Sequence, residues 1–209
     1  MILEWEGVLA DTSSARRDSL RRALADEGVQ SDAPSIALEQ MQRSDPTLAD
    51  LVALRATRAF AERLGNGFVL LPGAREFVEH AQLASRVAIV TTATRSETEF
   101  VLRLAGLDGA IATIVSADDM LDAPPSPAMI ERAVAQLSRL RSLQRSRIVS
   151  LASASVALCA ARAAGVRTVA VGAPAHVAVD ADGAVSGIEG LTMTDLTRLC
   201  GITAMERTS

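Results

Sequence analysis

Residues 3–12 read LEWEGVLADT, and this stretch separates two different patterns of sequence. An apolar run at 2–5 favours a short β-strand, and the carboxylates of Glu4 and Glu6 stand at and just beyond its end. From residue 13 to residue 71 the pattern is instead helix after helix, without a strand signal. The stretch therefore predicts a first strand that is followed at once by a helical insertion.

Short β-rich runs resume after the insertion and alternate with helical patterns. The runs are dominated by Val, Ile and Ala without strict alternation, as expected of parallel strands that are covered on both faces. The expected strands are 86–92, 112–116, 147–152 and 166–172, and the helical patterns are 75–83, 96–107, 127–140 and 155–165. This order predicts an α/β fold with a doubly wound, Rossmann-like parallel sheet and right-handed crossovers.

The sequence of the insertion predicts three helices. They are expected at about 13–27, 34–43 and 47–64. Thr12 or Ser13 can cap the first helix, and Gly28 ends it. We therefore predict a small helical cap formed by residues 13–71, inserted into a core formed by residues 1–12 and 72–209.

Composition bounds the class of protein. A chain of 209 residues suits one α/β domain with a small inserted subdomain. Its net charge of -4, without a dense basic run, argues against a nucleic-acid partner. No apolar run reaches the ~18 residues of a membrane span, and the N-terminus lacks a signal-peptide layout, so we expect a cytoplasmic protein without a membrane partner. Cys159 and Cys200 are expected to be buried free thiols.

The order of these segments resembles the haloacid dehalogenase (HAD)-like superfamily, and in particular its β-phosphoglucomutase and phosphoglycolate phosphatase branch. The likeness extends over nearly the whole chain. It is carried by GVLADT after the acidic pair, PGAREFVEHA at 72–81, TTATR at 91–95, PPSPAMIERAVAQL at 124–137 and AARAAGVRTVAVG at 160–172. The resemblance implies a HAD-like core with a helical cap, and a phosphatase or phosphomutase activity on a small phosphate ester.

The resemblance also assigns roles to residues near the first two strands. In the family a first-strand Asp attacks phosphorus, and the Asp two residues later is the general acid and base. Glu4 and Glu6 occupy these positions here. A misplacement of ~1 Å, about the length that one methylene adds, can lower a rate on the order of a hundredfold. Thr92 matches the family's hydroxyl residue, which binds the phosphoryl oxygens.

Two further family motifs have lost their charged groups. The Lys that neutralises the nucleophile and the phosphate falls on Pro124, and the chain contains no lysine that could replace it. The acidic residues that hold Mg²⁺ fall on Ala152 and Ser153, which leaves Glu4 and Glu6 as the candidate metal ligands. We expect Ser153 and Ser155 to cap the following helix instead.

Other charged residues have two interpretations each. Asp118 and Asp119 follow the strand at 112–116 and could reach the site, although a solvated turn is the more usual arrangement. Arginines also cluster in RLRSLQRSR at 139–147, where a solvated helix end is favoured over a site for an anionic partner.

Three functional hypotheses remain. The leading one is a catalytically impaired family member, a pseudoenzyme that needs no cofactor and retains at most a cleft for an anion such as a small phosphorylated ligand. The alternative is an active phosphatase that uses Glu4 and Glu6 with Thr92 and Mg²⁺. The third is a non-enzymatic interaction or regulatory protein, as a homo-oligomer or with a protein partner.

Overall fold

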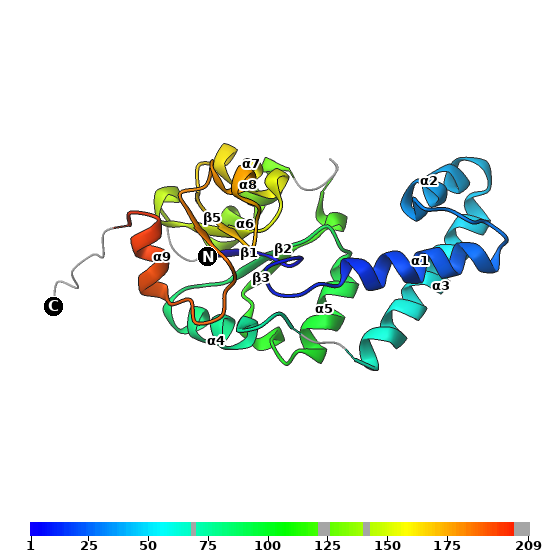
Figure 1. The fold of residues 1–209 in the computed structure, drawn as a ribbon, viewed down its shortest axis with the longest axis horizontal. Coiled ribbons are helices and arrows are strands. Elements are labelled where there is room, and N and C mark those ends of the chain that lie inside the picture. The colour runs from blue at the N-terminus through cyan, green and yellow to red at the C-terminus, as the bar shows by residue number, and fades with distance from the viewer. Residues whose placement is uncertain (68–69, 121–125, 140–142, 203–209) are drawn as a thin grey trace. The chain divides into compact units, whose positions relative to one another are not determined.

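Figure 1 shows the computed structural model, which describes residues 1–67, 70–120, 126–139 and 143–202. The chain divides into two compact units. The core unit comprises Met1–Ala10 and Val69–Ser209, and the cap unit comprises Asp11–Phe68. Pro124, the position that the resemblance assigns to a lysine, lies outside the described residues.

The core unit is built on a parallel sheet. Its strands are β1 (Ile2–Glu4), β2 (Ala88–Val90), β3 (Thr113–Val115), β4 (Val149–Ala152), β5 (Arg167–Val171) and β6 (Gly183–Val185). They pair in the order β3-β2-β1-β4-β5-β6, and every pairing is parallel. Leu3, in β1, pairs with Ile89 on one side and Leu151 on the other. The predicted doubly wound, Rossmann-like α/β fold is confirmed.

Helices cover both faces of this sheet (Figure 1). One face carries α6 (Pro127–Leu137), α7 (Ser155–Ala163) and the short α8 (Ala175–Ala178), and the other carries α4 (Ala74–Ala84), α5 (Arg95–Leu104) and α9 (Met193–Leu199). Strands β2 and β4 are buried along their whole length. Burial on both faces explains why the strands appear in the sequence as short apolar runs rather than as alternating patterns.

Some elements at the carboxyl-terminal end of the core were not predicted. β6, α8 and α9 are short, and β6 is an edge strand of three residues whose middle residue, Ala184, is exposed. An exposed edge needs no apolar run, so the sequence GAV carries little strand signal.

The expectation for the cysteines is half right, because Cys200 is buried but Cys159 is exposed.

The cap unit is a small helical bundle. Its helices are α1 (Ser13–Asp26), α2 (Pro34–Ser44) and α3 (Pro46–Gly65), and proline stands in the first turn of the last two. Ala23, Leu24, Met41, Ala49 and Val52 form its buried centre. Thr12 occupies the N-cap position of α1, although its side chain makes no capping hydrogen bond. None of the helices within the described ranges is long and apolar enough to cross a membrane.

The free energy of unfolding should depend strongly on the packing of side chains beside β1. Leu151 is 0% exposed, whereas Leu83, on α4, is 84% exposed. We expect Leu151→Ala to lower the free energy of unfolding by about 2–5 kcal/mol, because the emptied volume cannot collapse between two covered faces. The matched Leu83→Ala variant should change it by no more than about 0.5 kcal/mol. Denaturant titrations of the two variants beside the wild type measure both values, and equal effects would contradict this assignment of the core.

Candidate active site

The candidate site lies at the carboxyl ends of three neighbouring strands. β1 ends at Glu4, β2 at Val90 and β4 at Ala152, and β1 lies between the other two. In open parallel α/β sheets, ligands bind outside this edge, where the strand order reverses. Residues that directly follow these strands are therefore brought together although they are far apart in the sequence.

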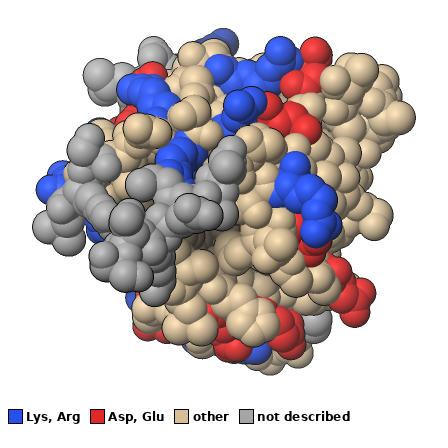
Figure 2. Space-filling model, turned by 90° about the vertical axis from the view of Figure 1, so that its left-hand side faces the viewer, with Lys and Arg blue, Asp and Glu red and all other residues tan. Residues whose placement is uncertain are grey.

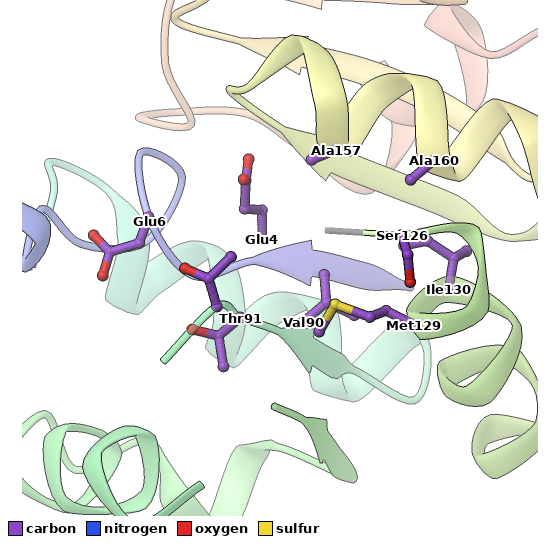
Figure 3. Close-up of a pocket in the computed structure, with 10 residues that line it drawn as sticks. Glu4, Glu6, Val90, Thr91, Ser126, Met129, Ile130, Ala157 and Ala160 are labelled. Atoms are coloured by element: carbon purple, nitrogen blue, oxygen red, sulfur yellow. The ribbon is translucent and has the colours of Figure 1, made fainter. Parts of the chain in front are cut away.

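A small pocket opens at this edge (Figure 3). Its polar lining residues are Glu4, Glu6, Thr91, Thr92 and Ser126, and its apolar ones are Val90, Met129, Ile130, Ala157 and Ala160. The pocket has a volume of about 30 Å³, which is on the scale of a single water molecule. Both glutamates and the threonine that the sequence singles out thus line one pocket, and none of its ten lining residues is basic.

Glu4 reaches across this edge to the loop between β4 and α7. Its Oε2 accepts hydrogen bonds from the backbone N–H of Ser153 at 2.7 Å and of Ala154 at 3.3 Å, and from the Ser153 hydroxyl at 3.2 Å. No hydrogen bond joins Oε1 to any residue that the structure describes. The carboxylate therefore lies just before the first turn of α7, where backbone N–H groups favour negative charge.

Neither Ser153 nor Ser155 caps α7, contrary to the prediction. The N-cap residue is Ala154, without a side-chain capping bond, and the Ser153 hydroxyl lies 3.2 Å from the backbone oxygen of Glu6 as well as from Glu4. The physical reason is that two acceptors from the β1 end lie within reach of this hydroxyl. Gly7 adopts a φ of +75°, and a Cβ there would overlap the Ser153 side chain. The turn after β1 and the loop after β4 are therefore packed directly on each other.

The environment of Glu4 is unfavourable for its charge. Burial raises the pKa of the Glu4 carboxyl above its ordinary value, and the charge of Glu6 acts in the same direction. Hydrogen bonds from Ser153 and Ala154 lower the pKa but only partly offset the effect of burial. Among the described residues, the largely buried carboxylate is thus stabilised by neutral donors alone.

The threonines after β2 have separate roles. Thr91 is buried, and its Oγ1 accepts a hydrogen bond from the Ala93 N–H at 3.1 Å. Thr94 caps α5 in a reciprocal capping box with Glu97. Thr92 is exposed, lines the pocket and makes no side-chain hydrogen bond to a described residue. Of these threonines, Thr92 is thus the one whose hydroxyl is available to a ligand, and its phosphate-binding role stays a prediction.

Asp118 and Asp119 accept hydrogen bonds from Arg95 at the start of α5 and do not line the pocket. Asp118 accepts the backbone N–H of Arg95 at 2.8 Å. Asp119 accepts the Ser116 N–H at 2.9 Å and the Arg95 guanidinium at 2.7 Å. Both carboxylates therefore hold β3 and α5 together, and the alternative of a catalytic role is not supported by their positions.

Sequence reasoning did not identify Ser126 as a pocket residue. It precedes Pro127 at the N-cap position of α6, where a serine normally caps the helix, but here it makes no capping bond. Its Oγ is buried without a hydrogen-bond partner among the described residues. An uncapped serine before a helix gives no sequence signal that distinguishes it from a capping one.

The described residues do not fit a magnesium site. Mg²⁺ prefers six oxygen ligands in near-octahedral geometry, usually with one or two carboxylates. Ala152 and Ser153 offer no carboxylate, and Oε2 of Glu4 already accepts three hydrogen bonds. Across the described ranges, no three His, Cys, Asp or Glu side chains gather in a way that could hold a metal ion.

The raised pKa of Glu4 predicts a pH-dependent effect of Glu4→Gln. The folded state holds this proton more tightly than the unfolded state, so stability is lost as pH rises from the ordinary to the raised pKa. Glutamine keeps an acceptor for Ser153 and Ala154 without the charge. We expect the variant to gain stability over the wild type as pH rises from mildly acidic to neutral, and Glu39→Gln, at an exposed position of the cap unit, is the control variant. Denaturant titrations across this pH range measure the difference, and a Glu4→Gln variant that is less stable at neutral pH would contradict it.

Comparison with known proteins identifies the family. The model of the haloacid dehalogenase-like hydrolase family matches residues 5–171. No curated protein matches this sequence.

Solved structures of the same fold are similar over almost the whole chain. CbbY from Rhodobacter sphaeroides in complex with phosphate is 21% identical with a TM-score of 0.76, covering 91% of this chain and 94% of that one. β-Phosphoglucomutase from Clostridium difficile is 16% identical with a TM-score of 0.75, covering 96% of each chain. A hydrolase from Pseudomonas syringae is 19% identical with a TM-score of 0.71, covering 97% and 98%. With the family model spanning most of its length, the chain belongs to the haloacid dehalogenase-like hydrolase family.

Proposed function

We propose that this protein is a catalytically impaired relative of the phosphatases and phosphomutases in its family, with a ligand-binding pocket in place of the reaction centre. The observation that carries the proposal is the set of hydrogen bonds from Ser153 and Ala154 to Oε2 of Glu4. These bonds engage the carboxylate at the nucleophile position with the loop in which the family places its metal ligands.

A carboxylate nucleophile must be ionised, and it needs a positive charge beside it when a phosphate approaches. Glu4 has a raised pKa, and none of the residues lining the pocket is basic. Two like unit charges 4 Å apart repel each other by about 4 kcal/mol at an effective dielectric constant of about 20. A phosphate dianion beside Glu4 and Glu6 would meet repulsion of this order without a compensating cation from the pocket lining.

An active phosphatase is the alternative, and the convergence of Glu4, Glu6 and Thr92 on one pocket favours it. One similar structure, CbbY, was solved with phosphate, and a mutant of that protein was solved with xylulose-(1,5)bisphosphate. The similarity to CbbY therefore suggests a small phosphorylated ligand. Fold similarity alone does not transfer that activity, because functions vary widely within one fold.

Turnover of phosphate esters separates the two proposals. We expect wild-type protein, assayed with magnesium over a panel of phosphate esters, to show no hydrolysis above that of a mock purification. Glu4→Gln and Glu6→Gln should be indistinguishable from it, since there is no glutamate-dependent step to lose. Hydrolysis by the wild type that disappears in both variants would overturn the proposal and establish a glutamate-based phosphatase.

A further inference from the structure

A group of arginines lies at the amino-terminal edge of the sheet, opposite the edge that carries the pocket. Arg86 stands two residues before β2, Arg147 stands two residues before β4, and Arg167 is the first residue of β5. Because every pairing in the sheet is parallel, these strands begin at the same edge. Arg139 follows α6, and Arg145 begins the short 3-10 helix (Arg145–Arg147) before β4. These five residues form what we call the arginine edge.

Hydrogen bonds and strand pairing hold the arginine edge together within the core unit. The Arg86 guanidinium donates to the backbone oxygen of Leu137 at 2.8 Å, which joins the end of α6 to the start of β2. The Arg145 guanidinium donates to the backbone oxygen of Ala164 at 2.8 Å, just after α7. Arg167 lies beside the start of β4 through the parallel pairing of β4 with β5. The five arginines are therefore neighbours on one surface although they come from separate segments of the chain.

Acidic side chains balance only part of the charge of the arginine edge. Arg145 pairs with Glu131 and Arg167 pairs with Asp182, each at 2.7 Å. The five arginines and these two carboxylates leave a local net charge of +3, in a chain whose formal net charge is -4. β1 runs from the N label toward the right in Figure 1, so Figure 2 views this edge of the sheet, and basic side chains gather in the upper part of that view. The arginine edge thus has the opposite sign to the molecule as a whole.

Arg139 and Arg147 are the members of the arginine edge whose side chains are available to a partner. Both are exposed, and neither forms an ion pair or a side-chain hydrogen bond with a residue in the described ranges. A guanidinium presents its N–H donors in a planar fork that matches the two oxygens of a carboxylate. An anion at this edge is therefore attracted both by two unpaired forks and by the net positive charge around them.

The arginine edge suits a short acidic peptide better than a nucleic acid. The segments 84–88, 139–147 and 165–169 contain no aromatic residue, so the edge lacks the side chains on which unpaired bases usually stack. A long polyanion would also extend beyond the edge, over a molecule that is negative as a whole. A short segment stays within the positive region, because charges farther away than about 8 Å are largely screened at physiological ionic strength. A short run of Asp or Glu residues is therefore the partner chemistry that fits.

We propose that the arginine edge is a docking surface for a short acidic segment of another protein, whose Asp or Glu carboxylates pair with Arg139 and Arg147. Arg145 and Arg167 keep their own partners and add to the positive field. The surface is separate from the pocket at the carboxyl-terminal edge, so the inference does not rest on the proposed function. Because the pairs form at an exposed surface, their affinity is modest and falls as the salt concentration rises.

Fluorescence anisotropy of a labelled hexaglutamate peptide tests the proposal. The full chain would be titrated into this peptide, into labelled hexaglutamine and into a labelled oligothymidylate of the same charge as hexaglutamate. The edge variant combines Arg139→Glu with Arg147→Glu. The control variant combines Arg22→Glu with Arg43→Glu, because these are exposed arginines of the cap unit that pair with no described residue. Both variants change the net charge equally, and thermal unfolding checks that each is folded.

We expect the wild type to bind hexaglutamate saturably at low ionic strength and not to bind hexaglutamine. The edge variant should raise the Kd for hexaglutamate at least about tenfold, which corresponds to about 1.4 kcal/mol, whereas the control variant should stay within about threefold of the wild type. Raising the ionic strength to about 0.15 M should weaken the binding of hexaglutamate to the wild type, because exposed charges are then screened over shorter distances.

Absence of saturable binding to hexaglutamate would overturn the proposal. An equal loss of affinity in the edge and control variants would also overturn it, because the binding would then follow the net charge of the molecule and not the arginine edge. Tighter binding of the oligothymidylate than of hexaglutamate would overturn the assignment of an acidic protein segment in favour of a nucleic acid.

Discussion

The contact between Glu4 and the loop after β4 is the interaction on which the rest of the site depends. The two partners are 149 residues apart in sequence, and the parallel pairing of β1 with β4 brings them together. Once Oε2 accepts from Ser153 and Ala154, the carboxylate occupies the position in front of α7 where an anion would otherwise be favoured. Gly7 is required by the same contact, since any Cβ there would overlap Ser153. The shape of the pocket and its charge both follow from this arrangement.

Most of the fold could be predicted because the sheet is covered on both faces. Strands such as β2 are then apolar at every position, and helices separate the strands, so strand and helix patterns are both visible in the sequence. β6 lies at the edge, where half-exposed residues suffice, and the sequence carries no comparable pattern. Figure 2 shows both acidic and basic side chains on one face of the molecule. The sequence has no repeating pattern of charged residues from which this surface could be predicted. Arg145, one of the clustered arginines, is paired with Glu131 and hydrogen-bonded to the backbone oxygen of Ala164, so part of that cluster serves to hold the loop before β4.

The candidate site could be predicted to the extent that topology alone determines it. Glu4, Glu6 and Thr92 follow or end adjacent strands, so any doubly wound sheet with this strand order brings them to the same edge. The partners of these residues depend on side-chain length and on loop conformation, which a pattern of residue types does not contain. The residue pattern therefore predicts that Ser153 caps a helix, whereas its hydroxyl bonds to Glu4. Ser126 has no distinguishing signal, because an N-cap serine and an unsatisfied one occupy the same position in the sequence.

A single added methylene can change which ligands a shared fold accepts. The family that this chain resembles has an aspartate at the position of Glu4, which faces a cation and a phosphate. Acidic residues after the strand that corresponds to β4 hold the same metal ion. Glutamate instead extends to the N–H groups of Ser153 and Ala154, so the protein's own carboxylate takes the place in which an external anion would be bound. The loop no longer needs acids, because the group in front of it is already negative and a second carboxylate would repel it. Under the proposed function, the absence of the lysine and of acids after β4 agrees with the position of Glu4, since in the family both serve a bound phosphate. On the proposed function, the carboxyl groups of Glu4 and Glu6 beside apolar side chains disfavour an anionic ligand, while the order of the strands beneath them is that of a doubly wound sheet.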